Sequence, residues 1–132
     1  MVGKYMDARR IGILLILTAV IVMTAAQLLI KSRLTHHGVV PVSPGLFFEY
    51  AQTLLADWKV WVGGMGLVIS AVLWYAALSR IPLSVAYPFA ALAYPIIFAG
   101  AIVTLRENFS WIVLLGNLLI VAGVLLVVRA AQ

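Results

Sequence analysis

The sequence contains no cysteine, and only 10% of its side chains are charged. Without cysteine, the chain can form no disulfide framework, no thiolate metal site and no cysteine nucleophile. The two histidines, His36 and His37, are adjacent in the chain, and no cysteine or further histidine exists to complete a zinc site with them. We therefore expect neither a bound metal nor a cofactor.

Acidic side chains are the scarcest charged groups. The four are Asp7, Glu49, Asp57 and Glu107, and each lies near a terminus or in a connection rather than inside an apolar run. The chain also has no glycine-rich loop of the kind that cradles a phosphate. Because no set of catalytic groups can be assembled from these residues, the sequence predicts a protein that is not an enzyme.

Apolar residues, by contrast, make up 65% of the chain, and the mean hydropathy is +1.15. A soluble domain of this length keeps too much of its chain at the surface to hide so many apolar side chains. Bilayer hydrocarbon solvates them instead. Four runs have the ~20 residues that a helix needs to cross this hydrocarbon. They cover about residues 11–30, 60–78, 85–105 and 109–128.

The connections between the last three runs are so short that consecutive helices must be antiparallel neighbours. We therefore expect an all-α fold, an integral membrane protein in which four transmembrane helices form an antiparallel bundle. The whole chain, residues 1–132, is expected to be a single domain. Because the number of crossings is even, both termini should lie on the same side of the membrane.

The first connection is longer than the others. Residues 31–42 are polar, and we expect them to be irregular. Ser43 followed by Pro44 is typical of an N-cap and a first helical position. Residues 45–57 then place apolar side chains on one side and polar ones on the other, which predicts a short amphipathic helix in the membrane interface. An ordered extension of the second transmembrane helix fits the same residues.

Basic residues lie at or beyond the ends of the apolar runs, although the net charge is +5. This distribution is typical of membrane proteins, because a charge in mid-bilayer is costly. It forms no basic patch, so we expect no nucleic-acid partner. Lys4, Arg9 and Arg10 precede the first run, whose flanking charge usually dominates the orientation, so both termini are expected in the cytoplasm.

The third run contains a repeated pair, Tyr87-Pro88 and Tyr94-Pro95. Seven residues are close to two helical turns, so the two tyrosines share a face and the two prolines share a face. Each proline removes a backbone donor and crowds the carbonyl four residues earlier, so the helix should bend or open locally. Such irregularity is found where helices line transporter sites. The alternative is that proline is simply common in membrane helices.

Three further polar residues are candidates for binding. Gln27 and Lys31 lie four apart and hence on one helical face, where they could meet an anionic group such as a phosphate, or where Lys31 could simply extend to the interface. The guanidinium of Arg106 presents a planar fork that suits phosphate oxygens. For Glu107 we expect a capping role at the start of the fourth helix. Gly116 and Gly123 form a stripe of small residues on the fourth run that suggests a dimer seam.

The order of these features resembles that of the drug/metabolite transporter superfamily, whose members include EamA-like and small multidrug-resistance-like proteins. The resemblance is nearest to the four-helix undecaprenyl phosphate–aminoarabinose flippase small subunits, and it covers nearly the whole chain. The matching elements are Gln27-x-x-x-Lys31, Leu73-Trp74-Tyr75-x-x-Leu78, Ile81-Pro82-Leu83-Ser84-x-Ala86-Tyr87-Pro88, Glu107-x-x-Ser110, Gly116 and Gly123.

The resemblance implies a flippase subunit that moves a polyprenyl-phosphate-linked sugar across the bacterial inner membrane. Lys31 and Arg106 would then lie near the phosphate, while Gln27, Tyr87 and Tyr94 would face the sugar. Pro88 would belong to the same substrate-binding site. The lipid carrier is the expected ligand, and the expected assembly is a homodimer or a heterodimer with a homologous four-helix subunit.

Two other functions remain open. One is export of a small molecule or drug, as in the small multidrug-resistance branch. Those transporters use a glutamate in the first helix, eight residues before a lysine, and the corresponding position here is Met23. The other is an accessory membrane subunit of a glycosyltransferase system, without a pathway of its own.

Overall fold

The computed structural model describes residues 2–130, with side chains from Asp7 onward. In this part of the chain there are six helices and no strand. They are α1 Val2–His37, α2 Pro44–Leu55, α3 Trp58–Leu78, α4 Leu83–Ala90, α5 Ala93–Thr104 and α6 Trp111–Ala130. Four stretches are long and apolar enough to cross a membrane, with α4 and α5 together forming the third. The all-α membrane fold expected from the sequence is therefore confirmed.

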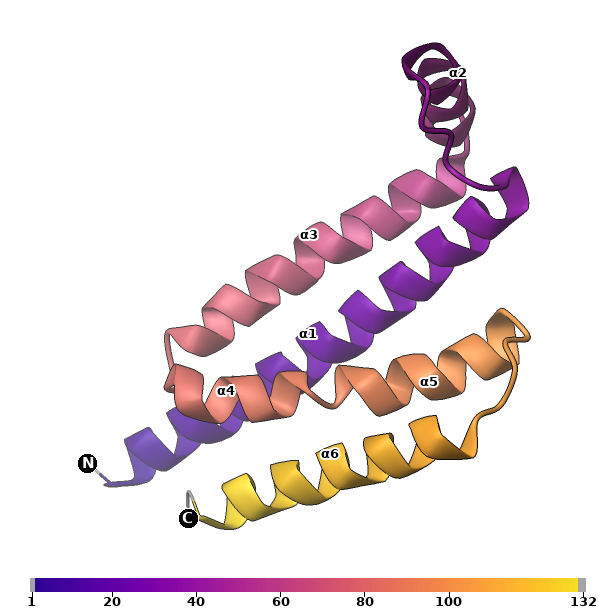
Figure 1. The fold of residues 1–132 in the computed structure, drawn as a ribbon. Helices are drawn as coiled ribbons and strands as arrows, with labels where there is room; N and C mark the ends of the chain where they lie inside the picture. Colours follow the sequence, from indigo (N-terminus) through magenta and orange to yellow (C-terminus); the bar gives the residue numbers. More distant parts are fainter. Residues whose placement is uncertain (1, 131–132) are drawn as a thin grey trace.

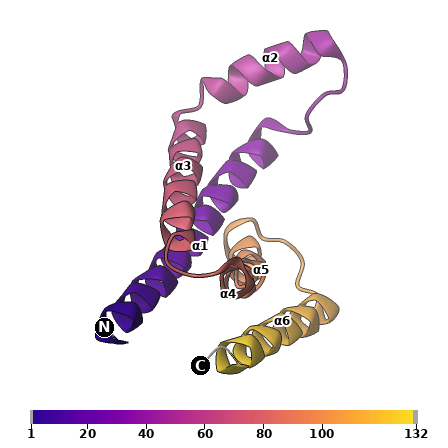
Figure 2. The same cartoon turned by 90° about the vertical axis from the view of Figure 1, so that its left-hand side faces the viewer.

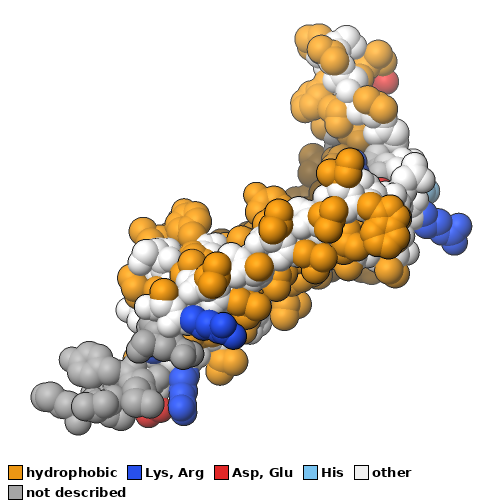
Figure 3. All heavy atoms as spheres, turned by 60° about the horizontal axis from the view of Figure 1, so that its bottom comes forward, with side chains coloured by type: hydrophobic (Ala, Val, Ile, Leu, Met, Phe, Trp, Pro, Cys, Tyr) orange, Lys and Arg blue, Asp and Glu red, His pale blue; other side chains and the backbone are white. Residues whose placement is uncertain are grey.

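The four spans run up and down beside one another (Figure 1). Helix α1 packs most extensively on α3, and α4 and α5 also contact α1, whereas α6 packs on α4 and α5. The two ends of the described chain lie at the same end of the bundle, and α2 projects from the opposite end (Figure 2). Hydrophobic side chains cover much of the face in Figure 3, with lysine and arginine toward its two ends.

The seam between α1 and α3 is built from small residues. Gly63 lies against Ile30, and a Cβ added to it would be 2.5 Å from Cγ1 of that isoleucine. One turn further along, a Cβ on Gly66 would be 2.9 Å from the Cβ of Ala26. Lipid tails are as apolar as leucine, so close packing of this kind is a main source of helix association in a bilayer.

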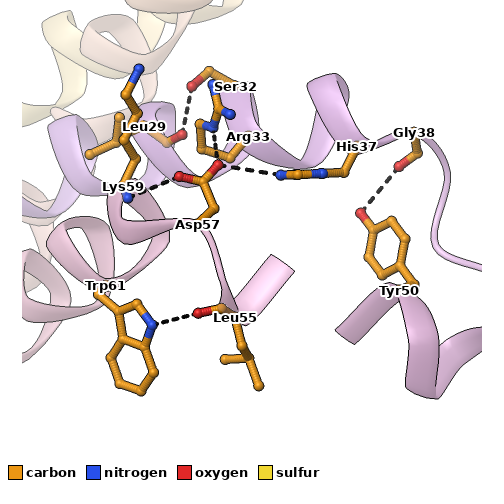
Figure 4. A network of polar contacts seen from close by, with 10 residues as sticks. All are labelled: Leu29, Ser32, Arg33, His37, Gly38, Tyr50, Leu55, Asp57, Lys59 and Trp61. Atoms are coloured by element: carbon orange, nitrogen blue, oxygen red, sulfur yellow. Dashed lines mark hydrogen bonds and ion pairs between the residues drawn. The ribbon is translucent and has the colours of Figure 1, made fainter. Parts of the chain in front are cut away.

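Helix α1 is longer than the apolar run that predicts it. The expectation that residues 31–42 are irregular was wrong for residues 31–37, which continue the helix to His37. The reason is a long-range contact, because the carboxylate of Asp57 accepts hydrogen bonds from Nε of Arg33 and, at 3.3 Å, pairs with Nε2 of His37 (Figure 4). The same carboxylate accepts the backbone N–H of Lys59 at 3.0 Å and so caps α3.

These contacts lower the pKa of the Asp57 carboxyl in the folded protein. The Asp57 side chain is only 9% exposed, and this burial raises its pKa. The opposing effects are larger in sum: hydrogen bonds from the Arg33 side chain, from the Lys59 backbone N–H and from the His37 side chain, together with the positive charge of Arg33. Together they lower the pKa from 3.8 to about 2. The carboxylate thus stays ionised at neutral pH and ties the end of α1 to the start of α3.

Helix α2 is separate from α3 rather than an extension of it. The chain turns at Ala56 and Asp57 between them, and no residue of α2 is buried. Two contacts tie α2 to the neighbouring segments: the Tyr50 hydroxyl donates to the carbonyl of Gly38 at 3.2 Å, and the Trp61 indole N–H donates to the carbonyl of Leu55 at 2.8 Å. The short helix expected in this connection is therefore present as a distinct element. Its location in the membrane interface stays a prediction.

The third span is interrupted between α4 and α5, as the prolines predict. Pro95 has no N–H to donate to the carbonyl of Ala91, which instead accepts the N–H of Tyr94 at 3.1 Å in a tighter turn. Pro88 lies inside α4 without ending it. The break therefore comes from the second Tyr-Pro pair and divides the span into two short helices.

The turn into α6 differs from the expectation for Glu107. Arg106 adopts a left-handed conformation with φ of 56°, which ends α5 and lets the N–H of Glu107 reach the carbonyl of Ala101 at 3.3 Å. Helix α6 begins only at Trp111, and its first turn contains no acidic residue. The capping role expected for Glu107 was therefore wrong.

Candidate functional site

Three cavities follow one another along α4 and α5. The first, of about 440 Å³, is walled by α1, α3 and α4 and includes Gln27, Ser70, Trp74 and Tyr87. Its floor is apolar, formed by small and aliphatic residues of α1 and α3. The indole of Trp74 meets the ring of Tyr87 edge-on, with centroids 5.7 Å apart, so these two aromatic side chains set the shape of one wall.

The second cavity, of about 480 Å³, continues from the first across the break in the third span. It shares Met23, Gln27 and Tyr87 with the first cavity and adds Tyr94. The residues between α4 and α5 also line it, because Ala91 belongs to its wall. The interruption of the helix thus opens directly onto this space.

The third cavity, of about 310 Å³, lies between α5 and α6. It shares Tyr94 and Ile97 with the second cavity, and its far wall includes Glu107, Asn108 and Asn117. We call the three cavities together the groove.

The groove runs between the two ends of the bundle. Its first cavity includes Tyr75, which is three residues before the end of α3, on the side where the two ends of the chain lie. Its third cavity includes Glu107 and Asn108, in the connection between α5 and α6 at the opposite end. Polar wall residues are therefore found at successive levels of the bundle within this single chain.

Three of the six residues predicted to bind substrate come together in the groove. Gln27 and Tyr87 line its first and second cavities, and Tyr94 lines its second and third. Both tyrosines are well exposed, at 63% and 64%. Their convergence depends on the contacts of α1 with α4 and α5. Their role in binding stays a prediction.

The other three predicted residues line none of the three cavities. Pro88 is half-buried in α4, next to Tyr87. Lys31 and Arg106 are exposed. The glycine at position 100 packs against Leu28, which brings the end of α5 level with the end of the α1 apolar run, so both cations lie at the same end of the bundle.

Several groove residues were not among those predicted to bind substrate. Trp74 and Tyr75 line the first cavity, and Asn117 lines the third. A signal did exist for Trp74, because Leu67, Ser70 and Trp74 share one face of α3 at helical spacing. For Glu107 no local signal exists, since its position depends on the left-handed turn at Arg106.

The groups that line the groove are suited to hydrogen bonding. Within residues 7–130, no three histidine, aspartate or glutamate side chains come together as a metal site would require. The polar groups along the walls are amide, phenol and hydroxyl groups with one carboxylate, which suit hydrogen bonding to a polyhydroxylated ligand.

The sequence is similar to several curated bacterial proteins, each described as a probable 4-amino-4-deoxy-L-arabinose-phosphoundecaprenol flippase subunit ArnF. One from Erwinia tasmaniensis is 34% identical over 88% of this chain and 93% of its own length. One from Klebsiella pneumoniae strain 342 is 38% identical over 86% of this chain and 92% of its own. One from Shewanella sediminis is 31% identical, over 88% and 86% respectively. No family model and no solved structure matches the sequence.

Proposed function

Because the chain belongs to the family of ArnF flippase subunits and is thus a membrane transporter subunit, we propose that it carries an amino-sugar headgroup, linked to a polyprenyl phosphate, across the bilayer. The relatives are named for 4-amino-4-deoxy-L-arabinose on phosphoundecaprenol. The physical task is to move a polar, charged headgroup through about 30 Å of hydrocarbon while the lipid tail stays in it.

The observation that carries this proposal is the groove. It extends from one end of the bundle to the other, and it shares its polar wall residues from cavity to cavity. Its three cavities, of about 310 to 480 Å³, fall in the size range of small-ligand pockets. A headgroup could occupy each in turn, with its tail left in the surrounding lipid.

Within the groove, Gln27, Tyr87 and Tyr94 hydrogen-bond the sugar in this proposal. An amide and two phenols can each donate and accept, which matches the hydroxyl groups of a pentose. Lys31 and Arg106, at the end of the groove, attract the phosphate when the headgroup arrives or leaves. Exposed cations at a groove end act mainly by this electrostatic attraction.

The break between α4 and α5 supplies the movement that transport requires. Pro88 and Pro95 each lack a donor, so the helix has fewer backbone bonds to lose when its halves change their angle. Interrupted helices at a binding site are a recurring feature of transporters. Pro88 therefore acts here through the shape of the site, next to Tyr87.

We place the protein in the bacterial inner membrane with both termini in the cytoplasm. The placement of the termini rests on the basic residues that precede the first span and on the even number of spans. The groove would then lead from the cytoplasmic leaflet to the outer leaflet.

The active assembly in this proposal is a dimer, with a second copy or a homologous four-helix subunit. Helix α6 leaves one side uncovered: a Cβ added at Gly116 or at Gly123 would meet no atom within 4 Å. Small residues on an open membrane helix allow a partner helix to approach closely. A partner there would also close the third cavity, one wall of which is α6.

The exporter of cationic drugs is the weaker alternative. Met23, which occupies the position of the glutamate in that branch, lines the first two cavities and brings no charge to them. A purely accessory role is also weaker, because the groove lies within this chain.

The test is a flipping assay in proteoliposomes that contain the full chain together with any partner that co-purifies. The substrate is undecaprenyl phosphate carrying 4-amino-4-deoxyarabinose. Alanine in place of Gln27, Lys31, Tyr87, Tyr94 or Arg106 should reduce the initial rate, because each removes a contact to the headgroup. Matched controls are Arg129→Ala and Tyr50→Phe, which alter an arginine and a tyrosine outside the groove.

The controls should transport at the wild-type rate. Full activity in all five alanine variants would contradict the residue assignment. If the wild-type assembly moved no lipid-linked sugar but did move a soluble cation, the exporter would replace the flippase.

A further inference from the structure

The third cavity differs from the rest of the groove, because its walls include a carboxylate, that of Glu107, and a buried asparagine, Asn117. Asn117 is only 7% exposed. Its Nδ2 donates to the carbonyl of Val113 at 2.8 Å, one turn back on α6. Its Oδ1 is buried and has no hydrogen-bond partner among the described residues. Since buried polar atoms are nearly always paired, this oxygen points to a donor that the folded chain does not provide.

Glu107 lines the same cavity, and its carboxylate is not engaged. In residues 7–130 its side chain makes neither a hydrogen bond nor an ion pair, whereas Asp57 is held by Arg33 and His37. The neighbouring Arg106 lines none of the cavities of the groove. Arg106 adopts the left-handed conformation, and Glu107 is the residue of this turn that belongs to the cavity wall.

The oxygens in this cavity share one chemical preference. The carboxylate is acceptor-only, the Asn117 oxygen is an acceptor, and the hydroxyls of Tyr94 and Ser110 in the same walls can accept as well. A primary ammonium carries three donors and a positive charge, so it satisfies several of these oxygens at once. No lysine or arginine is among the residues of this cavity.

We infer that the third cavity is a subsite for a primary ammonium group, with Glu107 as the charged acceptor and Asn117 as the buried one. The inference rests on the proposed function, and it identifies the sugar's amino group as the feature that this end of the groove selects. A phosphatidylethanolamine headgroup offers the same ammonium, so the experiment has to separate the two sources.

The test compares two lipids, undecaprenyl phosphate carrying 4-amino-4-deoxyarabinose and the same lipid with its amine acetylated. Acetylation removes the charge and keeps the sugar, the phosphate and the tail. Binding to the full chain, with any co-purified partner, is measured by native mass spectrometry from vesicles of phosphatidylcholine and phosphatidylglycerol. The wild type should prefer the free amine by about tenfold, as expected for one hydrogen bond to a charged group.

Glu107→Gln should abolish most of this preference while affinity for the acetylated lipid stays unchanged. Asn117→Asp should increase the preference, because it adds a second negative charge at the buried position. Glu49→Gln is the matched control, since it removes an exposed carboxylate on α2, outside the groove. Glu107 is exposed, so its replacement does not threaten the fold.

An undiminished preference for the free amine in Glu107→Gln would overturn the inference and leave the proposed function intact. Binding of neither lipid by the wild type would overturn the proposed function and the inference with it. A repeat with phosphatidylethanolamine in the vesicles separates the sources. Displacement of the amino-sugar lipid that depends on Glu107 would assign the subsite to the phospholipid headgroup and overturn its assignment to the sugar.

Discussion

Replacing Gly63 with alanine should loosen the pairing of α1 with α3. The added Cβ would lie 2.5 Å from Cγ1 of Ile30 and 3.3 Å from the carbonyl oxygen of Ala26. Carbon atoms pack at about 3.5–4.0 Å, so the side chain or the helix must move by about 1 Å. Overpacking of a well-packed contact by a methyl group costs about 1–3 kcal/mol.

The neighbouring Gly64 offers a matched control, because an added Cβ there meets no atom within 4 Å. Both substitutions replace a glycine in the middle of the same helix, so both gain the same helix propensity, up to about 1 kcal/mol. The difference between the two variants therefore isolates the steric cost. We expect Gly63→Ala to be less stable than Gly64→Ala by about 1–3 kcal/mol.

The assay is reversible unfolding in mixed micelles, with the free energy extrapolated to the native detergent. A double variant tests the contact itself: Ile30→Ala removes Cγ1, so it should cost less in the presence of Gly63→Ala than alone. Equal stability of the variants at positions 63 and 64 would refute the packing described for this seam. It would also contradict the arrangement of the first cavity, whose wall depends on the packing of α1 against α3.

Three more predictions concern the connection, the break and the open face. Because the Asp57 carboxylate has a pKa of about 2 in the folded protein and 3.8 ordinarily, the thermal stability should fall as pH drops from about 4 to about 2; Asp57→Asn should be less stable at neutral pH and should lack this acid dependence. Pro95→Ala supplies the N–H that a continuous helix would donate to the carbonyl of Ala91 in place of the tighter turn from Tyr94. Stability should therefore rise by about 0.5–1.5 kcal/mol while the flipping rate falls, and unchanged transport would argue against a role for the break. Gly123→Leu should leave the monomer's unfolding unchanged but abolish the dimer in native mass spectrometry, whereas an intact dimer would place the seam elsewhere.

The membrane spans and the break could be predicted from the sequence because their causes are local. Hydrocarbon thickness demands about 20 apolar residues wherever a helix crosses, and a proline lacks its N–H in any context. The Tyr87-Pro88 and Tyr94-Pro95 pairs therefore pointed to an interrupted helix, and the interruption, at residues 91–92, lies just before the second pair.

The end of α1 and the far wall of the groove could not be predicted, because they depend on distant contacts. Residues 31–37 have no apolar periodicity, and they stay helical where Asp57, 24 residues after Arg33, engages them. The placement of Glu107 depends on one backbone conformation at Arg106. The free oxygen of Asn117 is a property of the packed helices and has no signature in the residue order.

The length of α1 has a consequence for the lipids around it. The apolar run of α1 is about 30 Å long at 1.5 Å per residue, which matches the hydrocarbon, so its helical extension rises roughly 10 Å further. That is enough to pass through one headgroup layer. If the apolar run is centred in the hydrocarbon, the pair of Arg33 and Asp57 lies at the level of the lipid phosphates, which then compete with the aspartate for the guanidinium. Membranes rich in anionic lipid should weaken this ion pair, and zwitterionic membranes should preserve it. The lipid headgroup composition would thus change how strongly Asp57 links the end of α1 to the start of α3.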